Sequence, residues 1–296
     1  MSGFTRRDFM KTSLAAGALA GVEGLPLQAA GRGSATDKVA LGKSGMQVTR
    51  LAFGTGTNNG EVQSGLGQRE FSRLVAYAYE RGIRFFETAE AYSTPAMLGE
   101  ALKSYPRESY QLMSKVTTDQ GADPLQRFDA MRKESKTDYF DIMLLHWQHT
   151  AEWADETKRW QDGVLEAQAR KMIGVRGASV HGLPALRAMP GNQWLEVAMI
   201  RMNHKGVRMD GPTYRDGDNP GNVGEVVEHV RQVKEQGMGV VSMKLIGAGV
   251  FAPSREDRQA AMRFAFRKAG VDAVTVGFKN TAEVDEAIDN LNQALA

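Results

Sequence analysis

The sequence of 296 residues contains no cysteine. It therefore has no disulfide bond, no thiol nucleophile and no thiolate metal site. An excess of charge of one sign is also lacking, since 37 lysines and arginines nearly balance 35 aspartates and glutamates. The net charge of +2 gives no electrostatic reason to expect binding to nucleic acid or to a membrane surface. A hydrophobic content of 42% and a charged content of 24% are typical of an ordinary soluble globular protein.

The N-terminal segment has a short apolar stretch but no run long enough to span a membrane. Residues 5–11 (TRRDFMK) form a charged head, residues 12–22 are small and mildly apolar, and a small-residue tail ends at Ala30. The apolar part is far shorter than the ~20 residues that a spanning helix needs. This pattern is typical of an export signal, although an irregular basic tail is the alternative.

The paired arginines Arg6 and Arg7, followed by phenylalanine and lysine, resemble a twin-arginine signal. We therefore predict a signal peptide over residues 1–34 and a folded domain over residues 35–296. The predicted partner of the signal is the twin-arginine export machinery, with no stable membrane anchor and a periplasmic location. This route carries proteins that are already folded, which would suit an enzyme that binds its cofactor before export.

From residue 35 onward, short apolar runs alternate with amphipathic helical patterns. The runs are continuously apolar, as in strands of a parallel sheet that is covered on both faces. In 68–81, Phe71, Leu74 and Ala78 share one helical face and Gly82 gives a stop signal. The predicted strands are 50–55, 83–88, 110–116, 140–146, 173–179, 195–203, 239–245 and 273–277. The predicted helices are 68–81, 95–105, 123–135, 156–170, 181–189, 225–236, 255–268 and 281–294.

Eight strands that are each followed by a helix predict an α/β fold, the (β/α)8 TIM barrel. An open doubly wound sheet is the rival, but Gly54-Thr55-Gly56 lacks the G-x-G-x-x-G spacing expected after its first strand. Residues 39–49 predict a β-hairpin before the first barrel strand. The long connection 203–224 is rich in glycine, proline and aspartate, and long loops of this kind usually shape a substrate pocket.

Four polar residues stand where predicted strands end. Glu87 ends the second strand, Tyr92 lies in the following loop, Lys115 ends the third strand and His146 ends the fourth. The functional face of such a barrel lies at the C-terminal ends of its strands, so these side chains should converge. Tyrosine has a usual pKa of about 10, which a nearby ammonium lowers. Such a set suits protonation of an oxygen that becomes negative when hydride reaches a carbonyl carbon.

The chain resembles the aldo-keto reductase family over most of residues 36–290. Residues 41–48 (LGKSGMQV) resemble the family opening L-G-x-[ST]-G-x-x-V, and residues 87–92 keep the spacing of D-T-A-x-x-Y. The motif L-G-x-A-L follows at 98–102, and 138–146 reads as the family does before its histidine. Residues 243–249 and 276–280 resemble one bacterial branch.

This resemblance implies a role for each of the four polar residues. Tyr92 would donate the proton, Lys115 would lower the pKa of that phenol, and His146 would orient the substrate carbonyl. Glu87 stands where the family has aspartate, so its carboxylate would still pair with the lysine after some adjustment. The implied substrate is a small-molecule aldehyde or ketone.

The resemblance also implies a nicotinamide coenzyme, with NADPH favoured and NADH possible. Gly54 and Thr55 would lie near the nicotinamide, with Ser179 at its carboxamide and Met243 stacked on its ring. Lys244 would meet the pyrophosphate, Lys279 and Asn280 the 2′-phosphate, and Glu286 the adenine. Val180 and Met199 replace two family amides, and Glu283 replaces an arginine common in NADP-dependent members.

Other interpretations remain open. Glu87 and Lys115 could form an ion pair without catalytic use, and Arg201 and His204 either enter the pocket or are solvated in the loop. His146 and His149 are three apart, but no third ligand is evident, so no metal site is predicted. The chain could be a coenzyme-binding sensor or interaction subunit with little turnover. A barrel isomerase or lyase that uses no coenzyme is a further alternative.

Overall fold

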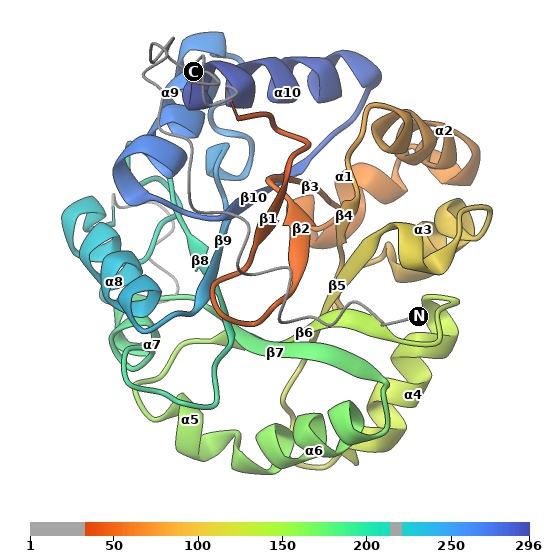
Figure 1. Ribbon diagram of the computed structural model, residues 1–296, viewed down its shortest axis with the longest axis vertical. Helices are drawn as coiled ribbons and strands as arrows, with labels where there is room; N and C mark the ends of the chain where they lie inside the picture. The colour runs from red at the N-terminus through yellow and green to blue at the C-terminus, as the bar shows by residue number, and fades with distance from the viewer. Residues whose placement is uncertain (1–32, 214–220) are drawn as a thin grey trace, which may run out of the picture. The chain divides into compact units, whose positions relative to one another are not determined.

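The computed structural model describes residues 33–213 and 221–296, and eight parallel strands in it close into a barrel (Figure 1). The predicted signal peptide lies outside the described residues except for its last two positions. Strand neighbours follow the chain order, and the last strand pairs with the first to close the ring. The barrel strands are β3 (Leu51–Gly54), β4 (Phe85–Glu87), β5 (Gln111–Val116), β6 (Phe140–Gln148), β7 (Ile173–Val180), β8 (Val197–Arg201), β9 (Gly239–Met243) and β10 (Ala273–Gly277). The predicted (β/α)8 barrel and its eight strands are confirmed.

Helices surround the barrel strands (Figure 1). The predicted helix 156–170 is divided at Thr157, whose hydroxyl donates to the Trp153 carbonyl at 2.7 Å. The predicted helix 181–189 is shorter than expected because the preceding Gly182 has φ 117, outside helical geometry. The helices are α1 (Glu61–Ser64), α2 (Gly67–Glu80), α3 (Pro95–Leu102), α4 (Pro124–Glu134), α5 (Trp153–Glu156), α6 (Lys158–Ala169), α7 (Leu183–Arg187), α8 (Val223–Glu235), α9 (Arg255–Arg263) and α10 (Thr281–Leu295). A π-helical turn (Phe264–Ala269) continues α9.

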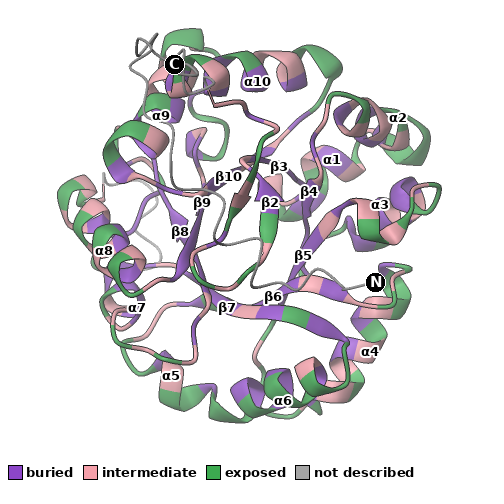
Figure 2. Ribbon diagram, in the orientation of Figure 1, coloured by how far each residue is buried: buried purple, intermediate pink, exposed green. Residues whose placement is uncertain are grey.

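The core has two parts, as expected for a barrel inside a ring of helices. The larger cluster includes Phe53, Phe86 and Leu145, together with residues on the buried faces of the helices. The smaller cluster includes Phe85, Ile142 and Leu144. Successive strand residues point to opposite faces. The larger cluster therefore holds the outward side chains of the strands, and the smaller cluster holds the inward ones. Figure 2 shows the barrel strands almost wholly buried while the helices expose their outer faces.

A β-hairpin covers the N-terminal end of the barrel, and the hairpin predicted over residues 39–49 is confirmed. It consists of β1 (Lys38–Ala40) and β2 (Gln47–Thr49), paired antiparallel. Leu41 and Val48 from the hairpin belong to the inward cluster. The Lys43 N–H donates to the Gly237 carbonyl at 2.7 Å, just before β9 begins. The hairpin therefore lies at the end of the barrel opposite to the strand ends that carry the predicted site.

Candidate active site

The inward-facing positions of the barrel strands lead directly to the predicted site. On β6, Ile142 and Leu144 are inward, so the alternation places His146 on the same side. On β5, Met113 is inward, so Lys115, two residues later, is inward as well. The inward residues at or near the C-terminal strand ends are Gly54, Glu87, Lys115, His146, Ser179, Arg201, Met243 and Thr275. These side chains therefore form the upper layer of the barrel interior.

A buried ion pair lies at the centre of this layer. Lys115 Nζ is bonded to Glu87 Oε1 and also donates to the Thr88 carbonyl at 2.8 Å. Thr275 Oγ1 donates to the other oxygen of Glu87 at 3.3 Å. Burial lowers the pKa of Lys115, while the Glu87 carboxylate acts in the opposite direction. The predicted pairing of this lysine with the longer carboxylate is confirmed.

Tyr92 lies between this ion pair and the histidine. Lys115 Nζ is 4.7 Å from the centre of the Tyr92 ring. The His146 ring meets the Tyr92 ring edge-on, with centroids 5.7 Å apart. The lysine and the tyrosine are therefore in contact across the top of the barrel.

The protonation states differ from the sequence prediction in one respect. Burial, together with the adjacent Glu87 carboxylate, raises the pKa of Tyr92 well above its usual value. The predicted lowering by Lys115 is wrong for the net direction in this structure, because burial and Glu87 prevail. Burial and then the cations Lys115 and Lys244 lower the pKa of His146 to about 3. At neutral pH the phenol thus keeps its proton and the imidazole is uncharged.

Sequence reasoning missed Gly56, which holds open the space for the Tyr92 ring. A Cβ built on Gly56 would lie 2.4 Å from two ring carbons and 2.6 Å from the hydroxyl oxygen. No real Cβ contact is this close, so any side chain here must displace the tyrosine. The glycine lies in a loop just after β3, and only its position against Tyr92 reveals its importance.

We expect Gly56→Ala to lower kcat/KM on the order of a hundredfold, because a displacement near 1 Å can have this effect. The measurement is steady-state reduction of an aldehyde, with circular dichroism to verify the fold. Gly121→Ala is the matched control, since a Cβ there meets nothing within 4 Å. Equal activity in both variants would contradict the assigned position of Tyr92.

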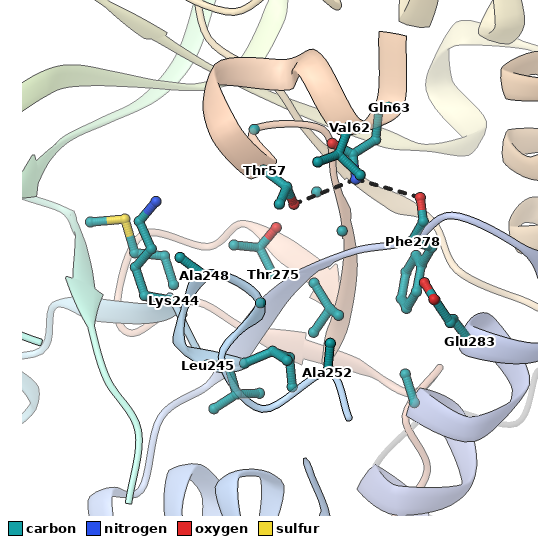
Figure 3. A pocket seen from close by; sticks show the side chains of 18 of the residues that line it. Thr57, Val62, Gln63, Lys244, Leu245, Ala248, Ala252, Thr275, Phe278 and Glu283 are labelled. Atoms are coloured by element: carbon teal, nitrogen blue, oxygen red, sulfur yellow. Dashed lines mark hydrogen bonds between the residues drawn. The ribbon is translucent and has the colours of Figure 1, made fainter. Parts of the chain in front are cut away.

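A cavity of about 560 Å³ opens beside Tyr92 and extends to the start of α10. In Figure 3, Lys244 lies at one end of this cavity and Glu283 at the other, with Thr275 between them. Of the residues predicted to bind coenzyme, five line it: Gly54, Met243, Lys244, Lys279 and Glu286. The described residues contain no group of three or more potential ligands that could hold a metal ion.

Three other predicted coenzyme residues make contacts inside the protein and are not among the described residues that line the cavity. Thr55 Oγ1 donates to the Glu87 carbonyl at 3.0 Å, and Ser179 Oγ accepts the Trp147 N–H at 3.0 Å. Asn280 caps α10 by accepting the Glu283 N–H at 3.0 Å. Their contact with a coenzyme stays a prediction.

Charged residues surround the far end of the cavity. Glu286 is held by Arg258 through two hydrogen bonds of 2.7 and 2.9 Å, and this arginine lowers the pKa of the carboxyl. Glu283 accepts the Lys279 N–H at 2.8 Å. Arg258 lines the cavity but was not predicted, because its place on α9 gives no periodic signal that distinguishes it from a surface arginine.

Residues 50–258, more than half of the chain, match the profile of the aldo/keto reductase family. The chain belongs to the aldo/keto reductase family. Residues 3–22 match the signal sequence of the twin-arginine translocation pathway, as predicted from the paired arginines. Across 33–213 and 221–296, no helix has both the length and the apolar character needed to cross a membrane.

Relatives of the chain agree with that family assignment. It is 28% identical over 155 residues to "Probable aldo-keto reductase 1" of Glycine max, covering 48% of this chain and 45% of the relative. It is 32% identical over 134 residues to the methylglyoxal reductase of Escherichia coli O157:H7, covering 42% and 48% respectively. The matches span about half the length, or less, of these curated relatives.

The fold is also that of solved structures. A holo-form aldo-keto reductase from Bacillus halodurans superposes with a TM-score of 0.66 at 17% identity. The alignment covers 87% of this chain and 94% of that protein. At this level of identity the likeness shows the fold alone, so the chemistry must be argued from the residues of the site.

Proposed function

We propose that this aldo-keto reductase transfers hydride between a nicotinamide coenzyme and an aldehyde or ketone, with Tyr92 as the general acid. The supporting observation is the contact of Tyr92 with Lys115 on its ring face and His146 at its edge, beside the cavity. In reduction, two electrons enter as hydride at the carbonyl carbon, and the oxygen takes the phenol proton. The neutral His146 ring donates to the same oxygen and fixes its position.

The bound coenzyme would supply the hydride, and the cavity residues fit such a group. The cationic Lys244 suits a pyrophosphate, and Met243 offers a polarizable surface to a flat ring. We propose NADPH as the preferred form, with Lys279 near its 2′-phosphate. NADH is the alternative, because the negative charge of Glu283, beside that lysine, repels a phosphate.

Coenzyme titration followed by a substrate panel tests this proposal. Quenching of tryptophan fluorescence by NADPH, more strongly than by NADH, is the expected binding result. Loss of reduced-coenzyme absorbance on adding aldehydes is the expected activity. Absence of quenching with either coenzyme would contradict the proposal and favour a barrel isomerase or lyase.

A coenzyme-binding sensor with little turnover is the second candidate. It is favoured by the raised pKa of Tyr92 and by Glu87, whose charge contributes to that shift. Binding of coenzyme without reduction of any carbonyl in a broad panel would support this reading over the reductase.

We propose that residues 1–34 direct the folded domain, residues 35–296, to the periplasm. Replacing both Arg6 and Arg7 with lysine should leave most of the protein in the cytoplasm, because the signal is identified by its arginine pair. Fractionation with immunoblotting measures the distribution and the shorter mature chain. Finding the unmutated protein in the cytoplasm would refute the export proposal.

A further inference from the structure

A second group of polar side chains lies in the same upper layer of the barrel but has no part in the proposed proton transfer. Arg201 ends β8 and shares the inward face of Val197 and Met199. His181 follows β7, and its ring centroid lies 6.4 Å from that of His146. The sequence left open whether Arg201 enters the pocket, and it is only 5% exposed within the rim.

A buried aspartate from the loop after β8 fixes the position of both residues. Asp210 Oδ1 accepts Arg201 Nε at 2.6 Å and the Gly182 N–H at 2.7 Å. One oxygen therefore ties the arginine to the turn that carries His181. Asp210 is fully buried, which raises the pKa of its carboxyl, whereas Arg201 and Gly182 act in the opposite direction.

Two nitrogens beside this clamp are buried and unpaired. Arg201 Nη2 and His181 Nε2 have no hydrogen-bond partner among residues 33–213 and 221–296, and neither does Asp210 Oδ2. Leaving a buried polar group unpaired is costly, so such a group calls for an explanation, and a bound ligand that pairs with it is one. A guanidinium group that is held at Nε by one carboxylate is suited to bind a second carboxylate through Nη2.

The surrounding charge favours an anion. Arg201 and Lys244 are among the cations that lower the pKa of His181, after burial itself. Glu87 and Asp210 are each bonded to a cation, Lys115 and Arg201 respectively. Lys244 has no ion-pair partner within the described part of the chain, and it is one of the cations that act on both histidines.

We propose that the substrate is a short oxo acid whose carboxylate is bound by Arg201 Nη2 and His181 Nε2. This inference rests on the proposed function, because it places the carbonyl oxygen of the same molecule at Tyr92 and His146. The ring centroids from Tyr92 to His146 and from His146 to His181 are 5.7 and 6.4 Å apart. These spacings suit a carbonyl and a carboxylate separated by only a few carbon atoms.

The test compares succinic semialdehyde with its methyl ester, which has the same aldehyde but no charge. We expect the wild-type protein to prefer the acid by about tenfold or more in kcat/KM, as a charge-assisted hydrogen bond gives. Arg201→Lys keeps the charge next to Asp210 but removes the second guanidinium nitrogen, so the ratio of acid to ester should fall toward one. Arg231→Lys, in an exposed ion pair on α8, is the matched control and should leave the ratio unchanged.

His181→Leu provides a second variant that leaves the Arg201–Asp210 pair intact, and it should lower the same ratio. A wild-type preference for the ester would overturn the inference while leaving the reductase proposal standing. Equal losses for acid and ester in both variants would also overturn it, since they indicate a structural role.

Calorimetry with succinate, which cannot be reduced, separates this inference from the proposed function. Succinate that binds to the wild type and only weakly to Arg201→Lys supports the carboxylate subsite even if no aldehyde is reduced. If succinate does not bind and both aldehydes are inert, the subsite and the reductase function are both refuted.

Discussion

Tyr92→Phe should lower kcat/KM for carbonyl reduction by about a hundred- to ten-thousandfold, the usual contribution of a positioned general acid. The substitution removes the hydroxyl proton but keeps the ring, whose centre lies 4.7 Å from Lys115 Nζ and whose edge meets His146. Binding of coenzyme should therefore stay close to that of the wild type. Stopped or continuous assays of reduced-coenzyme absorbance measure the rate, and fluorescence titration measures the affinity.

The pH profile provides an independent reading of the same group. Because burial and Glu87 raise the pKa of Tyr92, the proton needed for reduction is retained throughout the neutral range. The rate of reduction should therefore decline only above pH ~10, which is the usual pKa of a phenol. If Tyr92→Phe retains a tenth or more of the wild-type kcat/KM, another group donates the proton.

Lys115→Met should destabilise the folded protein by about 3–5 kcal/mol, the usual effect of removing one partner from a buried ion pair. Glu87 is 3% exposed, so its carboxylate would keep its burial while losing the cation bonded to it. The Thr88 carbonyl would lose its donor as well. The free energy of unfolding in urea gives the measurement.

Two further variants make this prediction specific. Adding Glu87→Gln to Lys115→Met should recover most of the lost stability, because no charge is then left buried without a partner. Lys158→Met breaks an exposed ion pair with Asp162 and should cost at most about 1 kcal/mol. Similar losses for Lys115→Met and Lys158→Met would contradict the buried character of the Glu87–Lys115 pair.

Much of the architecture could be read from local pattern. Continuous apolar runs such as 140–146 and helical faces such as that of Phe71 and Leu74 recur at the intervals of a (β/α)8 barrel. The hairpin was predictable because Gly45 and its neighbours mark a turn between two short strands. The division at Thr157 was not, since neither glycine nor proline marks the residue where the backbone leaves helical geometry (φ −103, ψ 12).

The site could be predicted only in part from the sequence. The ends of the predicted strands identified Glu87, Lys115 and His146, because polar residues that follow a buried apolar run stand out in the sequence. The net pKa of Tyr92 could not be predicted, since it depends on how deeply the ring is buried and how near it comes to Glu87. Ser179 and Asn280 likewise have partners that no motif discloses.

The sequence by itself determined the strand and helix order, the export signal, and the chemical groups that the barrel gathers at one end. Those follow from apolar periodicity and residue type, which act over a few neighbours along the chain. Only the tertiary structure decided that Gly56 makes room for Tyr92 and that Asp210 clamps Arg201 with a nitrogen left unpaired. Gly56 and Tyr92 lie in loops after different strands, and Asp210 lies in an irregular loop nine residues after Arg201. These contacts depend on how the loops fold, which no local periodicity predicts.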